Sequence, residues 1–249
     1  MNCWNPLKPG PHSVAGNGKR DGPKRAWMNI PQGIYTLLEG EEMGNQQPST
    51  CVDLSEAITN ARLGDGHFWR HPECKNSKII WSSICEDWVR WKQEHLLPAS
   101  LRGSVNVRNR KKDSTYANAK PIWTATSLVH PDFTDAHEQL DCFEALSGLS
   151  DLGLGMWFLD DGCTVRRNDG GSLRVSISLG PELSSDPDFV LDWARDRFGT
   201  ASAGRVAKNN SRASERNKVW IVPKPIAVQI LTMARKIAPS ALLYKTPTW

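Results

Sequence analysis

From about residue 50 onward, the spacing of apolar and polar positions predicts helices and strands in a regular order. Within residues 86–97, Trp88 and Trp91 recur at the spacing of one helix face. Within residues 173–179, apolar and polar positions alternate, which is typical of a half-buried strand. The predicted helices are residues 53–63, 86–97, 132–146, 151–160, 188–198 and 226–237. The predicted strands are residues 67–70, 79–84, 104–110, 116–126, 163–167, 173–179, 205–208 and 218–222.

This order of elements, a helix and a hairpin, a second helix and hairpin, then a closing helix, occurs twice. Asp65 lies 58 residues before Trp123, and Asp161 lies 59 residues before Trp220. The two copies are offset by 96 residues, which indicates an internal duplication. Similar units within one chain usually pack about a pseudo-two-fold axis, as the subunits of a homodimer do. We therefore expect an α+β fold of two pseudo-symmetric units.

The composition is that of a globular chain with a distinct N-terminal segment. Apolar residues make up 39% and charged residues 23% of the 249 positions. No window approaches the roughly 18–20 apolar residues that a membrane span needs. Residues 1–30 carry five basic residues against one acidic residue and show no periodicity. We expect a flexible basic arm over residues 1–49, followed by units over residues 50–147 and 148–249.

The cysteines indicate the compartment. Six cysteines are present without any CxxC pair, and no apolar export segment follows the N-terminus. Such a pattern indicates reduced thiols rather than a disulfide framework. We therefore expect a cytoplasmic protein, in a bacterium or in the host cell of a phage, with an organelle as the alternative, and no membrane partner.

The positive charge is concentrated in the predicted hairpins. The whole chain has a net charge of +4, whereas the four hairpin segments together carry +14. Those segments are residues 66–84, 102–120, 162–179 and 205–224. The compensating acidic residues lie on helices, mainly within residues 132–151. A basic face on an otherwise neutral to acidic molecule is typical of a protein that binds a phosphate backbone.

The side chains on these hairpins suit a DNA groove. Ser104, Asn106, Arg108 and Arg110 share one face of a strand, because side chains alternate with period two. These residue types read base edges in a major groove, which a two-stranded ribbon can enter. A solvated sheet face is the alternative for any single hairpin, but four basic hairpins in repeat register favour nucleic acid. The predicted DNA-binding residues are Arg70, Lys78, Asn106, Arg108, Arg110, Lys112, Arg166, Arg174, Arg205, Lys208, Arg212, Arg216 and Lys218.

Two Asp-Gly pairs mark the candidate chemistry. Asp65-Gly66 and Asp161-Gly162 each end an apolar helix and open a strand. A pseudo-two-fold arrangement places those helices side by side and brings the two carboxylates together, facing the basic sheets. Two carboxylates at one place repel each other unless a hard cation lies between them, and Mg²⁺ prefers oxygen ligands. A divalent cation beside a basic groove favours phosphodiester hydrolysis.

Residues 58–66 and 154–162 resemble the two copies of the LAGLIDADG motif of homing endonucleases. The flanking His67-Phe68 and the segment 156–162 are typical of intron- and phage-borne members of this family, and the resemblance covers about residues 50–249. In the first motif, Asn60 and Arg62 stand where the family's helix packing favours small or apolar side chains.

The resemblance implies a fold, a site and a reaction. It implies an αββαββα unit per motif with saddle-shaped antiparallel sheets, and a monomer that acts on a long, asymmetric DNA duplex. The implied metal ligands are the carboxylates of Asp65 and Asp161 and the backbone carbonyls of Gly64 and Asp160, holding Mg²⁺ or Mn²⁺. The implied product is a staggered double-strand break with 3′ overhangs. The implied additional catalytic residues are Lys224 and Lys120.

Two other functions remain open at this point. One is an RNA maturase that assists intron splicing, with intron RNA as the partner, and the other is a non-catalytic DNA-binding regulator on the same fold. Retention of both acids, Asp65 and Asp161, favours the endonuclease, because paired carboxylates repel the phosphates that a pure binder must hold.

Overall fold

The computed structural model describes residues 53–109, 120–166, 173–208 and 218–248. All of them belong to one compact unit, Val52–Trp249. The predicted basic arm, residues 1–49, lies outside the described residues. Within the described part of the chain, no helix has both the length and the apolar character needed to cross a bilayer.

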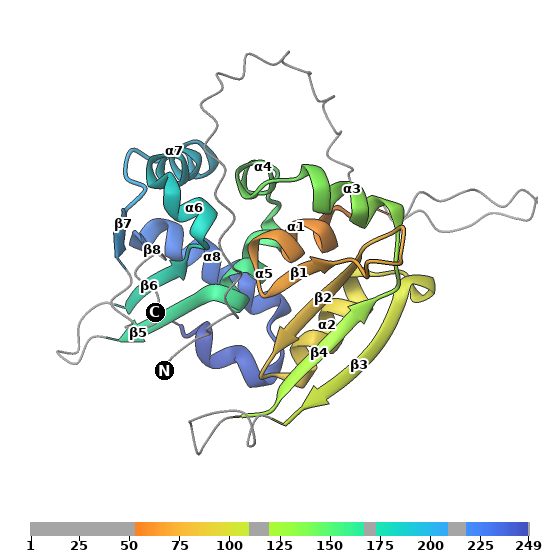
Figure 1. Cartoon of the computed structure of the whole chain (residues 1–249). Coiled ribbons are helices and arrows are strands. Elements are labelled where there is room, and N and C mark those ends of the chain that lie inside the picture. The colour runs from red at the N-terminus through yellow and green to blue at the C-terminus, as the bar shows by residue number, and fades with distance from the viewer. Residues whose placement is uncertain (1–52, 110–119, 167–172, 209–217, 249) are drawn as a thin grey trace, which may run out of the picture. The chain divides into compact units, whose positions relative to one another are not determined.

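The two halves of this unit repeat one architecture, shown in Figure 1. The first half comprises α1 (Ser55–Leu63), β1 (Gly66–Trp69), β2 (Lys78–Ser83), α2 (Glu86–Leu96), η1 (Ala99–Leu101), β3 (Arg102–Arg108), β4 (Ile122–Ser127), α3 (Pro131–Gln139) and α4 (Cys142–Ser147). The second half comprises α5 (Asp151–Asp161), β5 (Gly162–Arg166), β6 (Leu173–Ser178), α6 (Pro181–Ser185), α7 (Pro187–Phe198), β7 (Arg205–Lys208), β8 (Lys218–Val222), α8 (Lys224–Ile237) and η3 (Ser240–Lys245).

Each half forms an antiparallel four-stranded sheet with the same strand order. The orders are β1-β2-β4-β3 and β5-β6-β8-β7. Each sheet buries a tryptophan, Trp81 on β2 and Trp220 on β8, at places that are not equivalent, because β8 corresponds to β4. The α+β class and the duplication predicted from the sequence are confirmed.

Two helices differ from the sequence-based prediction. The single helix expected over residues 132–146 is two helices, α3 and α4, separated at Leu140 and Asp141. The Asp141 carboxylate accepts a hydrogen bond from the backbone N–H of Glu144 at 2.8 Å, so this residue caps a new helix instead of continuing the old one. The short helix α6 was not predicted, and it begins with a proline at its first position, Pro181.

Helices cover one face of each sheet and leave the other face open. In the first half, α1 packs on β1 and β2, and α2 packs on β2, β3 and β4. In the second half, α6, α7 and α8 pack against the sheet. On the opposite faces, the side chains are exposed or half-buried. We call these the outer faces of the two sheets.

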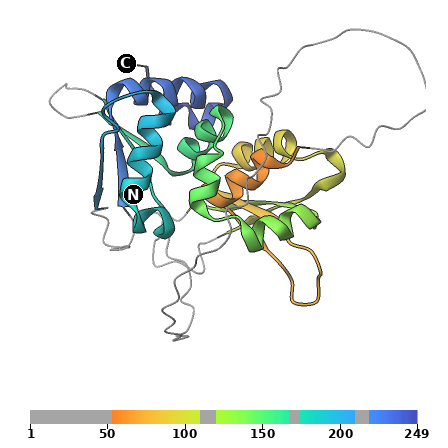
Figure 2. The same ribbon diagram turned by 90° about the horizontal axis from the view of Figure 1, so that it is seen from above.

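The helix α5 is the centre of the unit. Its residues from 153 to 159 are all buried. It contacts α1 of the first half and α8 of its own half, and Figure 2 shows α1 beside α5 from above. The close approach to α8 favours Gly155, because a Cβ there would lie 3.2 Å from the backbone nitrogen of Ala234, closer than most such contacts. The motif helices therefore lie side by side, as the pseudo-two-fold arrangement predicted.

Candidate metal centre

The two motifs meet where α1 and α5 end. We call this place the seam and define it by Gly64, Asp65, Asp160 and Asp161. The Asp160 carboxylate accepts hydrogen bonds from the side-chain amide of Asn60 at 3.0 Å and from the backbone N–H of Asp65 at 3.2 Å. These bonds join residues 100 and 95 positions apart in the sequence. The end of one motif is thus held directly by a side chain of the other.

Asp65 and Asp161 both have raised pKa values, and the charge of Asp65 acts on the carboxyl group of Asp161. Loss of hydration raises the pKa of Asp65 to about 6, and the negative charge of Asp160 adds to the shift. Loss of hydration also raises the pKa of Asp161 well above its usual value, with further contributions from the charges of Asp65 and Asp160. Asp65 is exposed and Asp161 is half-buried, so both remain accessible from solvent. The structure therefore brings together the two acids singled out from the sequence.

A buried ion pair lies directly beside these acids. Lys92 on α2 donates to the two carboxylate oxygens of Asp160 at 2.6 and 2.7 Å. Both side chains have no exposed surface. The indole N–H of Trp88 donates to the same carboxylate at 2.7 Å. The Asp160 carboxylate therefore accepts five hydrogen bonds. A buried charge is stable only when it is paired and hydrogen-bonded in this way.

The seam is asymmetric at one pair of equivalent positions. Gly64 in the first motif corresponds to Asp160 in the second. A Cβ on Gly64 would overlap Oδ2 of Asp160. A side chain at position 64 would therefore force the Asp160 carboxylate to shift, and Asp160 occupies the space that glycine leaves free.

A second lysine reaches the seam from the C-terminal segment. Lys245, the last residue of η3, donates through Nζ to the backbone carbonyls of Leu159 at 2.7 Å and Asp160 at 3.1 Å. Its positive charge counteracts the raised pKa values of both Asp65 and Asp161. It also sits at the C-terminal end of α5, where the helix dipole favours a cation.

The donor chemistry of the seam fits a hard divalent cation. Three carboxyl groups, those of Asp65, Asp160 and Asp161, lie near two ammonium groups, so one negative charge is uncompensated when all three are ionised. Within the described residues, no group of three or more His, Cys, Asp or Glu side chains is arranged to hold a metal ion. A cation here would need backbone carbonyls, water or phosphate oxygens as further ligands, which is how Mg²⁺ is usually bound.

The two lysines predicted from the resemblance are not among the charges that shift the pKa values of Asp65 and Asp161. Lys120 is exposed and lines a pocket of about 370 Å³ together with Glu86 and Tyr244. Lys224 is exposed at the start of α8. The charges that act on the two acids are those of Lys92 and Lys245, and the roles of Lys120 and Lys224 stay predictions.

Lys92 was not predicted as a site residue, but its position in the sequence indicates a buried charge. Trp88, Lys92 and Leu96 are spaced four residues apart on α2, and all three are buried. A lysine on the apolar face of a helix requires a buried acid as its partner. The additional carboxylate in the second motif, Asp160, is the residue that meets this requirement.

The predicted DNA-binding residues divide between the two sides of the sheets. Strand alternation and register place five of them on the outer faces, namely Lys78, Asn106 and Arg108 on the first sheet and Arg174 and Arg205 on the second. Three more have the opposite parity and lie at strand ends, namely Arg166, Lys208 and Lys218. Four lie outside the described residues, namely Arg110, Lys112, Arg212 and Arg216.

Arg70 differs from the expectation because it follows β1 on the helix-covered side. Its guanidinium donates to Glu138 on α3 at 2.6 Å instead of joining the outer face. The outer face of β1 carries Trp69 instead, and the ammonium of Lys78 lies 4.8 Å from the centre of this ring. This cation–π contact orients Lys78 on the surface.

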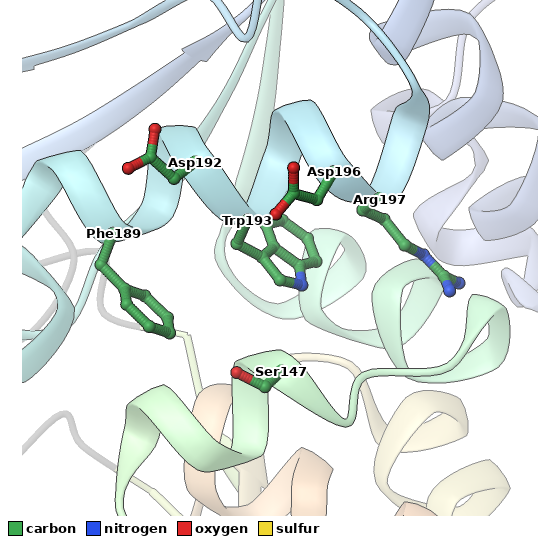
Figure 3. A pocket seen from close by; sticks show the side chains of 6 residues that line it. All are labelled: Ser147, Phe189, Asp192, Trp193, Asp196 and Arg197. Carbon is green, nitrogen blue, oxygen red and sulfur yellow. The ribbon is translucent and has the colours of Figure 1, made fainter.

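A pocket of about 440 Å³ lies between α4 and α7 (Figure 3). Its lining includes the carboxylates of Asp192 and Asp196 but none of the seam residues. Asp192 pairs with Arg195 on the same helix. The pocket is therefore separate from the candidate metal centre.

Comparisons with known proteins identify similar sequences but no family profile. No protein-family model matches the chain. RecA of Mycolicibacterium flavescens is 24% identical over 174 residues, which cover 66% of this chain and 40% of that protein. RecA of Mycobacterium shimoidei is 22% identical over 189 residues, covering 69% of this chain and 43% of that protein. The chain thus spans about two fifths of the length of the curated relatives it matches.

Solved structures resemble the chain more fully. The homing endonuclease I-WcaI bound to its DNA recognition sequence matches with a TM-score of 0.58 and 12% identity, covering 82% of this chain and 96% of that chain. Mesophilic variants of the homing endonuclease I-DmoI match with a TM-score of 0.44 and 8% identity, covering 74% and 95%. The chain therefore has the fold of a homing endonuclease, and the resemblance to the LAGLIDADG family that its two motifs carry is confirmed at the level of the fold.

Proposed function

We propose that the chain is a site-specific endonuclease that makes a metal-dependent, staggered cut in double-stranded DNA. The observation that supports this most directly is the meeting of Asp65 and Asp161 at the seam, where loss of hydration raises the pKa of both carboxyl groups and the charge of Asp65 raises that of Asp161 further. A protein that only binds phosphates gains nothing from two carboxylates held at such a cost. A divalent cation removes this cost and gives the arrangement a function.

The seam residues have separable roles in this proposal. The carboxylates of Asp65 and Asp161, with the carbonyl of Gly64, would hold Mg²⁺ or Mn²⁺. When bound, the cation supplies Lewis-acid activation of water and compensates the charge that develops on the phosphate. The Asp160 carboxylate is already committed to Lys92 and therefore holds the backbone of Asp65 in place instead of binding metal.

The outer faces of the sheets would position the duplex over the seam. Lys78 and Arg108 lie on one outer face, and Arg174 and Arg205 lie on the other. Two residues separate α1 from β1, and α5 runs directly into β5. The carboxylates that would act on the phosphates therefore lie next to the sheets that would hold them. As in the resemblance, the expected active species is a monomer and the expected product has 3′ overhangs.

The experiment is cleavage selection from a randomised duplex library with Mg²⁺ or Mn²⁺, followed by assays on the selected target. Asp65→Asn and Asp161→Asn should each reduce the cleavage rate by about 1,000-fold or more, since metal activation supplies several kcal/mol. Both variants should bind the target as tightly as the parent. The matched control is Asp196→Asn, an exposed carboxylate on α7 that should leave cleavage unchanged.

Two outcomes would replace this proposal. Binding of a specific duplex without cleavage under either metal would make the chain a DNA-binding regulator. Binding of intron RNA in preference to any duplex, again without cleavage, would make it a maturase.

A further inference from the structure

Lys245 is held at the seam by an anchored segment. Its neighbours Leu242 and Thr246 are buried, with 5% and 1% of their surface exposed. The backbone of η3 is closed by a hydrogen bond from the N–H of Leu242 to the carbonyl of Pro239 at 2.8 Å. The long lysine side chain is thus presented from a fixed base, and its ammonium reaches two carbonyls of the last turn of α5.

One of these carbonyls is a ligand that the motif resemblance assigns to metal. The carbonyl of Asp160 accepts from Lys245 Nζ at 3.1 Å. An ammonium and a divalent cation on the same oxygen would repel each other strongly, because like charges a few ångströms apart near a protein surface cost several kcal/mol at an effective dielectric of about 20. The second motif therefore cannot offer this carbonyl to a metal while Lys245 is in place.

We propose that Lys245 takes the place of one divalent cation at the second motif, so that the seam binds one cation beside Asp65 and Asp161 instead of two. The inference refines the proposed function, since it specifies how many cations that site holds. Lys245 is a positioning residue here: it fixes the carbonyls of Leu159 and Asp160 and supplies one positive charge next to both acids.

The balance of charges supports a single cation. Lys92 neutralises Asp160, and the nearby charge of Lys245 offsets one of the two remaining carboxylates, so the seam carries one negative charge when both acids are ionised. One divalent cation changes this to one positive charge, which a phosphodiester group then neutralises. Two divalent cations beside Lys245 would leave an excess of positive charge at the partly buried end of α5.

Terbium titration of the purified full chain tests the inference without cleavage. Tb³⁺ binds oxygen donors as Mg²⁺ and Ca²⁺ do, and its luminescence can be excited through Trp88, which touches the Asp160 carboxylate. At pH 8 the parent should bind one equivalent. Lys245→Met should bind a second equivalent, or bind the first about tenfold more tightly, because a positive charge is removed. Lys245→Arg should resemble the parent, and Lys236→Met, on the exposed side of α8, is the matched control.

The outcomes separate the inference from the proposed function. An unchanged stoichiometry and affinity in Lys245→Met, in a variant whose thermal unfolding matches the parent, would overturn the inference. If that variant unfolds early, Lys245→Gln, which keeps a donor to the carbonyls without the charge, gives the same test. If Lys245→Met gains terbium binding but the parent chain cuts no duplex, the inference that Lys245 replaces a cation is supported and only the proposed nuclease activity is refuted.

Discussion

Replacement of Lys92 by methionine tests whether the buried ion pair holds the seam together. Methionine is similarly unbranched and fills the space of the lysine side chain without carrying a charge. The change leaves the Asp160 carboxylate with no exposed surface and without the two contacts at 2.6 and 2.7 Å. Removal of one partner from a buried pair usually costs about 3–5 kcal/mol, because the remaining charge is uncompensated.

The measurement is thermal and urea-induced unfolding followed by tryptophan fluorescence. For a unit of this size, 1 kcal/mol corresponds to about 2–4 °C, so Tm of Lys92→Met should fall by roughly 6–20 °C. The matched control is Lys236→Met, an exposed lysine on α8, which should stay within about 0.5 kcal/mol of the parent.

A double variant distinguishes the ion pair from simple loss of packing. In Lys92→Met/Asp160→Asn the orphaned charge is gone, and the amide oxygen can still accept from Trp88. We expect the second change to restore about half of the lost stability or more. A Lys92→Met variant within 1 kcal/mol of the parent, or a double variant less stable than Lys92→Met alone, would refute the reasoning.

Three further predictions concern the same region and the outer faces. Gly64→Ala should lose about 1–3 kcal/mol in urea unfolding, because its Cβ overlaps Oδ2 of Asp160, whereas Gly148→Ala, whose Cβ would lie 3.7 Å from the nearest atom, should be tolerated. The pKa of Asp65 is about 6 in the folded chain and near 3.8 in the unfolded chain, so folding takes up a proton between those values and stability falls as the pH rises through them. Asp65→Asn should therefore raise Tm at pH 8, and this gain should shrink toward pH 4; an equal gain at both pH values would contradict the assignment. Arg174→Ala and Arg205→Ala should each weaken duplex binding and reduce the salt dependence by about 0.9 in log–log slope, while Arg70→Ala, already paired with Glu138, should do neither.

Local patterns were sufficient to predict the sheets and the motif helices. The strands Arg205–Lys208 and Lys218–Val222 have the bounds that the sequence pattern predicted. Successive side chains in them point alternately to the helix-covered face and the outer face of the sheet. The charge of a hairpin does not determine on which side Arg70 lies, because side chains alternate along β1 and Arg70 has the parity of the buried Phe68. Counting parity from the buried Phe68 would have placed Arg70 with the helices.

The partners of the seam could not be predicted in the same way. Lys92 and Lys245 contact Asp160 across 68 and 85 positions of sequence. No local spacing encodes such contacts, since they depend on how α2 and the C-terminal segment pack around α5. The sequence does show each partner separately, namely Lys92 on an apolar helix face and the adjacent acids Asp160 and Asp161 in the second motif. Joining these partners required the tertiary structure.

The duplication within one chain explains why this seam can exist at all. In a symmetric dimer of a single-motif protein, the positions of Gly64 and Asp160 would hold the same residue. Aspartate at both would force two carboxylates into the space that one now fills, because even a Cβ on Gly64 overlaps Oδ2 of Asp160. Glycine at both would remove the buried acid and leave Lys92 without a partner. A fused pair of motifs removes this constraint, so one motif can supply the ion pair that holds the seam while the other supplies the space for it. The two acids proposed to hold the cation then remain equivalent in kind but are held differently, Asp65 through the side chain of Asp160 and Asp161 through the helix end that Lys245 binds.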